Sequence, residues 1–241
     1  GQYRDGYWQG YGFGPLAEGM SGFPHFQNLK FKGEFPIAEL LFSDGDFPAK
    51  VKLSAFNPFI PSDGKNSSIP GAFFEFEICN NDEEETEYFV EFTVVNPNSE
   101  GFNTKSKSDN ISMIFMHPAN KSRDDLEYKD MCIATDCVET FIQSYCYRGW
   151  YMDKAVAFWN DISADEDLKE RLYDSPGAED SCILCAKVTA KPKEVKKVRF
   201  VLSWNTPNCY NYWDEYKDEN GNHITWKNYY ATVFENSKAS A

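Results

Sequence analysis

The sequence is poor in basic residues and in histidine. Its 241 residues hold 24 Lys and Arg against 38 Asp and Glu, with three His, and the formal net charge is −14. Phosphate backbones and anionic membrane surfaces repel so acidic a chain, so we expect no nucleic acid partner. Neutral ligands such as sugars stay open, and a soluble acidic surface is the ordinary interpretation of the charge.

Long hydrophobic runs are also missing. No stretch reaches the roughly 18–20 apolar residues of a membrane span, so we expect none. No signal peptide opens the chain, which begins with Gly1 rather than Met. We therefore expect the sequence to be a segment of a longer protein.

The sequence also lacks a complete metal motif. Cys182-Ile-Leu-Cys185 has CxxC spacing, but no second CxxC or His pair accompanies it. On a strand, Cys182 and Cys185 would face opposite sides. Seven cysteines are an odd number, and a chain of this length needs no disulfide framework. We expect reduced, buried thiols, a cytoplasmic setting, and neither metal nor cofactor.

Catalytic constellations are not visible either. His25, His117 and His223 are scattered, without a Ser, Cys or His partner at motif spacing. The acidic clusters at 82–85 and 165–167 lie in polar turns and are typical of solvated surface. A carboxylate pair for glycoside hydrolysis must face a cleft at about 5–10 Å, and counting acidic residues leaves that possibility open.

Aromatic residues are abundant, at 17% of the chain, which favours strands. Alternating segments predict eight to ten strands, among them 71–80 and 86–95, which we expect to form a hairpin across a polar turn. One or two short helices are expected within 151–174, the second beginning near Ser163. With no repeat and no linker, an all-β fold follows: a large sandwich of two antiparallel sheets with a few short helices.

The expected organisation has three parts. Residues 1–20 form an extended, Gly- and Tyr-rich segment, residues 21–224 form the sandwich, and residues 225–241 begin a helical linker.

A loop rich in proline precedes the strand at 71–80. Its prolines fix φ and stiffen the chain, and polar side chains such as Asn57 can bond the backbone of the turns. Our hypothesis is that 57–70 is a structural joint at a domain interface. The residues that would form it are Asn57, Pro58, Phe59, Pro61 and Pro70.

A second segment, 203–216, is dense in Trp, Tyr and Asn. Such side chains can form a sugar platform, since rings pack on C–H faces while amides bond hydroxyls. The same residues are enriched where domains pack together, so both interpretations stay open. The candidate carbohydrate-binding residues are Trp204, Asn205, Tyr210, Tyr212 and Trp213.

Four stretches together resemble one family: SGFPHFQNLKFKGEFPIAELLFSD, AFNPFIPSDGKNSSIP, AFWNDISADEDL, and LSWNTPNCYNYW followed by WKNYYATVF. Their order and spacing are similar to the N-terminal domain of glycoside hydrolase family 116. That family includes bacterial β-glucosidases and the non-lysosomal glucosylceramidase. The resemblance runs from about Ser21 to the end of the chain.

The resemblance implies a supersandwich-like domain that packs on a C-terminal (α/α)6 catalytic domain of the same parent chain. The family's catalytic carboxylates lie in that toroid, so no catalytic residue is expected here. The leading hypothesis is a non-catalytic domain that supports and shapes the toroid of a retaining β-glycosidase. The rivals are an independent carbohydrate-binding module and, less favoured by the scattered histidines, a sandwich enzyme of mutarotase type.

Overall fold

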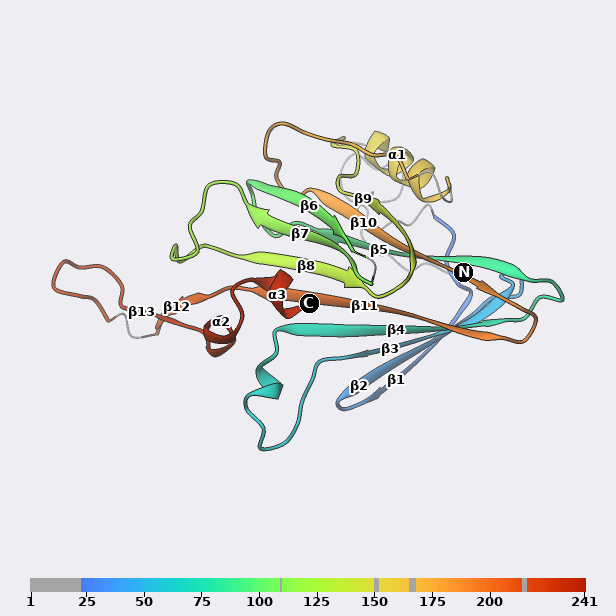
Figure 1. Cartoon of the computed structure of the whole chain (residues 1–241), viewed down its shortest axis with the longest axis horizontal. Helices are drawn as coiled ribbons and strands as arrows, with labels where there is room; N and C mark the ends of the chain where they lie inside the picture. The colour runs from blue at the N-terminus through green and yellow to red at the C-terminus, as the bar shows by residue number, and fades with distance from the viewer. Residues whose placement is uncertain (1–22, 109, 150–151, 165–167, 214–215) are drawn as a thin grey trace, which may run out of the picture.

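The computed structural model describes residues 23–108, 110–149, 152–164, 168–213 and 216–241. It is an antiparallel β-sandwich of two unequal sheets with few short helices, as predicted. A further sheet of two strands forms a ribbon, and Figure 1 shows that this ribbon projects from one end of the sandwich.

The large sheet has eight strands in the order β1-β2-β3-β4-β11-β8-β7-β6. Neighbouring strands run antiparallel. Its strands are β1 (Asn28–Glu34), β2 (Ile37–Ser43), β3 (Ala49–Phe56), β4 (Gly71–Asn80), β11 (Val195–Asn205), β8 (Asp130–Thr135), β7 (Ser112–Pro118) and β6 (Gly101–Lys107).

The small sheet has three strands, β5 (Thr86–Val95), β10 (Ser181–Ala190) and β9 (Glu139–Gln143). Helix α1 (Met152–Ile162) lies on its outer side, where Gln143 Nε2 donates to Asp161 Oδ2 over 3.1 Å. The projecting ribbon pairs β12 (Asn208–Tyr210) with β13 (Thr225–Lys227). A single 3₁₀ turn, η1 (Asn66–Ser68), interrupts the long loop between β3 and β4.

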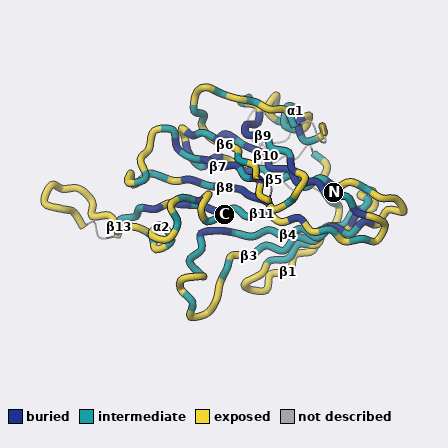
Figure 2. Tube along the Cα trace, in the orientation of Figure 1, coloured by how far each residue is buried: buried dark blue, intermediate teal, exposed yellow. Residues whose placement is uncertain are grey.

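The core lies between the two sheets, because alternate residues of each strand face inward. Phe200 of β11 is fully buried, and its ring lies 5.4 Å from that of Phe92 on β5. The alternation of apolar residues in 71–80, 86–95 and 195–205 predicts one apolar face on each strand, and the core cluster confirms Phe74, Phe92 and Phe200 on those faces. Figure 2 shows the buried residues concentrated along β8, β10 and β11, with exposure along the ribbon.

The predicted hairpin between 71–80 and 86–95 is wrong. The two strands exist, but β4 pairs with β3 and β11, whereas β5 pairs with β10 in the other sheet. The polar turn therefore carries the chain across the core, where the rings of Phe74 and Phe92 meet at 5.0 Å. Alternation identified the inward faces, but it did not determine which strands would share a ladder.

The helices also differ from the prediction. Within 151–174, α1 is present, but 163–164 and 168–174 contain no helix. Residues 225–241, where we expected the start of a helical linker, form β13 and two short helices, α2 (Tyr229–Val233) and α3 (Ser237–Ser240). The extended segment expected at 1–20 lies outside the described residues. Across the described ranges, no helix has the length and apolar character needed to cross a bilayer.

Candidate functional site

The β12–β13 ribbon carries most of the aromatic residues that we assigned to a sugar platform. Tyr212 and Trp213 are 67% and 84% exposed, and their rings lie 5.0 Å apart at 32°. Tyr210 is half-buried, with its ring 4.8 Å from His223. The ribbon therefore presents a pair of aromatic rings to solvent just beyond the end of β12.

The other two predicted platform residues lie apart from this pair. Trp204 is on β11, where its backbone N–H donates to Pro70 O over 3.0 Å. Asn205 is buried, and its Nδ2 donates to Asp130 Oδ2 and to Glu235 O. Its amide is therefore occupied inside the domain, and it does not join the exposed rings.

The joint loop, 57–70, is held by its own polar groups. Asn57 Nδ2 donates to Gly71 O over 2.6 Å, and Ser67 Oγ bonds both the N–H and the carbonyl of Ile60. Asp63 accepts from the N–H of Asn66, which helps to lower the pKa of Asp63. Pro70 is buried, while Phe59 and Pro61 are exposed. The loop is thus locally rigid and presents apolar side chains outward.

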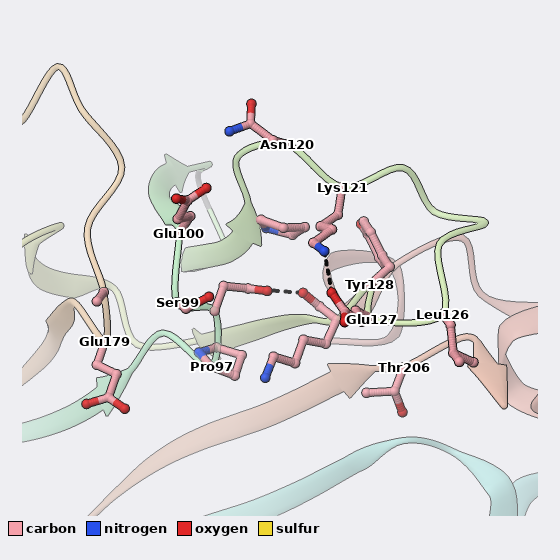
Figure 3. Close-up of a pocket in the computed structure, with 14 residues that line it drawn as sticks. Pro97, Ser99, Glu100, Asn120, Lys121, Leu126, Glu127, Tyr128, Glu179 and Thr206 are labelled. Carbon is pink, nitrogen blue, oxygen red and sulfur yellow. Dashed lines mark hydrogen bonds and ion pairs between the residues drawn. The ribbon is translucent and has the colours of Figure 1, made fainter. Parts of the chain in front are cut away.

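A cavity of about 660 Å³ opens where β5 ends and β8 begins (Figure 3). Lys121 bonds Glu127 across it, and Asn98 Nδ2 donates to Lys129 O over 3.1 Å. Burial and the neighbouring Asp130 raise the pKa of Tyr128, whereas the Lys121 partner lowers that of Glu127. The cavity thus offers a neutral phenol beside an ionised carboxylate and ammonium groups.

This cavity was not predicted from the sequence. Its walls come from the loops at 97–100, 118–129 and 178–179, together with Thr206, so they are distant in sequence. The only local signals were the Asn-Pro-Asn turn at 96–98 and the polar run that follows β7. Its hydrogen-bonding groups suit a neutral polyhydroxyl ligand, and its lining also includes the carboxyl groups of Glu100, Glu127 and Glu179.

The C-terminal segment is anchored by buried polar groups that the sequence did not reveal. Asp130 accepts from the N–H of Ser237 over 2.7 Å, and Ser203 Oγ donates to Ser237 O over 2.7 Å. Arg123 Nη2 donates to the carbonyls of Ala231 and Phe234. These bonds hold α3 against β8 and β11 and tie α2 to the loop between β7 and β8.

Four of the cysteines are buried, in surroundings that are structural rather than reactive. All seven are free thiols. Cys182 belongs to the core cluster and Cys185 lies outside it, as expected for opposite faces of β10. Burial raises the pKa of the Cys132, Cys146 and Cys185 thiols to about 12. Within the described ranges, no three His, Cys, Asp or Glu residues are grouped so that they could hold a metal ion.

The architecture defines the class of this protein: a β-sandwich domain with an anchored C-terminal segment and a projecting aromatic ribbon. A family model described as "beta-glucosidase 2, glycosyl-hydrolase family 116 N-term" matches residues 8–241. The chain therefore belongs to the family of N-terminal domains of glycosyl hydrolase family 116. The match begins ahead of Ser21, so it extends further towards the N-terminus than the resemblance in the sequence did.

The other comparisons do not extend this family assignment. No curated protein matches the chain. One solved structure that matches is a "Putative kojibiose phosphorylase from human microbiome", at 11% identity and a TM-score of 0.37. The alignment covers 70% of this chain and 18% of that protein.

Proposed function

We propose that this chain is the non-catalytic N-terminal domain of a larger β-glycosidase, where it supports and shapes a C-terminal catalytic domain. The family match over residues 8–241 carries the proposal. The parent's reaction would be hydrolysis of a β-glucoside or a glucosylceramide-like glycoside with retention, through two carboxylates outside this chain.

The carboxylates of the domain support this assignment. A retaining glycosidase needs one carboxyl group that stays protonated, which requires a raised pKa. Hydrogen bonds or cationic partners lower the pKa of eight described carboxyl groups, those of Asp44, Asp63, Glu75, Glu77, Asp124, Glu127, Glu194 and Asp218. These groups are suited to holding the sandwich together rather than to donating a proton.

The proposal is tested by labelling the full-length parent with a 2-deoxy-2-fluoro-β-glucoside, which traps the covalent glycosyl-enzyme of a retaining enzyme. Peptide mapping should place the label beyond residue 241. A labelled carboxylate within the chain would refute the non-catalytic assignment.

A second candidate function is an independent carbohydrate-binding module. The exposure of Tyr212 and Trp213, with rings 5.0 Å apart, favours it. Titration with a β-glucoside should then quench Trp fluorescence with saturation in the millimolar range, and Trp213→Ala should abolish the response. Trp226→Ala, on the stem of the same ribbon, is the matched control. No saturable change in the wild-type protein would eliminate this function.

We also propose a cytoplasmic location for the parent. The seven free thiols support it, because disulfides form and persist in oxidising compartments. Fractionation of the source cells, followed by immunoblotting against this domain, tests it. Recovery from a secreted fraction would contradict it.

A further inference from the structure

The outer face of the large sheet, turned away from the small sheet, has two unlike halves. One half carries a chain of alternating charges from β1 to β11. Its contacts are Lys32–Glu39 at 4.0 Å, Glu39–Lys52 at 3.4 Å, Lys52–Glu77 at 3.3 Å, Glu77–Lys197 at 2.9 Å, Lys197–Glu75 at 2.7 Å and Glu75–Arg199 at 3.0 Å. We call this the charge ladder, and it is built for contact with water.

The other half of the same face is apolar. Ile37, Phe56 and Phe73 are successive cross-strand partners on β2, β3 and β4, and Phe73 is paired in turn with Val201 on β11. The rings of Phe56 and Phe73 stack at 5.2 Å and 14°. Because register partners point to one side of a sheet, these residues form a continuous row.

The joint loop extends this row beyond the sheet. Phe59 meets Phe35, in the β1–β2 turn, with ring centroids 5.3 Å apart. Phe35 is 81% exposed and Phe59 is 50% exposed, and Ile60 beside them is also exposed. The set Phe35, Ile37, Phe56, Phe59, Ile60 and Phe73 is named the outer apolar strip. All members except the partly buried Phe73 are exposed, and a contiguous patch of large exposed side chains is typical of an interaction surface.

The strip lies next to the contact that α3 makes with the outer face of the large sheet. Ser203 lies two residues after Val201 on β11, hence on the same outer face, and it holds Ser237 of α3. Helix α3 packs against β8 and β11. Figure 1 shows α3 and the C-terminus lying across β11, beside β4. A segment that follows α3 in a parent chain would therefore leave the domain next to the strip.

We propose that the outer apolar strip is the docking surface for the catalytic domain that follows α3 in the parent, an inference that rests on the proposed function. The occupant is an apolar face of that domain, which buries Phe35 and Phe59 while the charge ladder stays in water. The joint loop thereby acquires a specific role: its internal hydrogen bonds fix Phe59 and Ile60 in position before docking, which lowers the entropy cost of the contact.

Hydroxyl-radical footprinting of the full-length parent tests the inference directly. Phe35 and Phe59 should be oxidised roughly tenfold less than their exposure in the domain implies, because an interface core excludes water. Leu172, which is 77% exposed and lies near α1 beyond the small sheet, should be oxidised at the rate of a free side chain. Oxidation of Phe35 and Phe59 at free rates would overturn the inference.

A variant pair gives a second readout in the same protein. Phe35→Ser with Phe59→Ser should make limited proteolysis separate the two domains faster and should lower the temperature of activity loss. Val156→Ser with Leu172→Ser, on exposed positions on and beyond α1, should change neither. Equal behaviour of both pairs would contradict the docking site.

The two proposals fail in different ways. A parent that hydrolyses β-glucosides but leaves the strip open to radicals retains the proposed function and refutes the docking surface. A parent without glycosidase activity refutes both, because the stated occupant is then missing.

Discussion

Four of the seven thiols of this domain are buried, and three are partly exposed. Cys132, Cys146, Cys182 and Cys185 are buried, and burial raises the pKa of each thiol. The thiolate is the reactive species, so these four should resist a disulfide reagent at pH 8. We expect at most three thiols to titrate promptly in the native protein and seven in denaturant, since the sequence holds seven cysteines. Prompt titration of more than three would contradict the structure.

Asp180 is a second residue with a testable role. Its carboxylate receives Arg148 Nε and Nη2 at 2.8 and 2.7 Å, and the guanidinium lies 3.9 Å from the Tyr173 ring centroid. Replacing Asp180 leaves the partly buried guanidinium of Arg148 without its carboxylate partner, so Asp180→Asn should lower the free energy of unfolding by about 2–4 kcal/mol.

Urea denaturation followed by Trp fluorescence measures this loss. Glu127→Gln is the matched control, because its bond to Lys121 also joins a carboxylate to a cation but lies in solvent. The control should leave the denaturation midpoint unchanged. Equal midpoints for Asp180→Asn and the wild type would show that the buried pair contributes nothing.

At the scale of elements, the charge ladder makes stability depend on pH. Hydrogen bonds from Lys197 lower the pKa of Glu75 and of Glu77 in the folded protein. A lowered folded pKa stabilises the fold above the unfolded value of about 4.3, and that contribution is lost as the pH falls through the folded pKa. The double variant Glu75→Gln, Glu77→Gln lacks this contribution.

The expected result is a gap in thermal midpoint between wild type and double variant that is largest near pH 7 and shrinks towards pH 3. Circular dichroism melts across this range measure it. A gap that stays constant with pH would contradict the assigned role of the ladder.

The joint loop makes a prediction of its own. Pro58→Ala with Pro61→Ala restores φ freedom to the loop, so the peptide bonds of 57–70 should be cut faster in limited proteolysis. Pro192→Ala, in the turn between β10 and β11, is the control for proline removal in a turn outside the loop. An unchanged cleavage rate in the loop would mean that its hydrogen bonds alone hold it.

The elements also show what a sequence can and cannot reveal. Alternation predicted that Phe74 and Phe92 face inward, because a strand turns successive side chains to opposite sides. It did not predict that β4 and β5 lie in different sheets, since ladder partners such as β11 come from distant parts of the chain. Asn205 likewise looked like a surface amide, but its partner Asp130 is 75 residues away.

At the scale of the whole molecule, family membership and architecture fit the proposed role of a supporting domain. The small sheet and α1 cover one face of the large sheet, and the charge ladder, the C-terminal anchor and the outer apolar strip share the other. A domain whose large sheet is covered on one face by its own small sheet, and which presents an apolar strip on the other face, is suited to support a neighbouring domain. The ribbon with Tyr212 and Trp213 projects beyond this body.

The most direct test of this role compares turnover of an aryl β-glucoside by the purified chain and by its full-length parent at equal concentration, with circular dichroism confirming that the chain is folded. The account predicts saturable hydrolysis by the parent and none above blank by the chain. Saturable hydrolysis by the folded chain alone would contradict it.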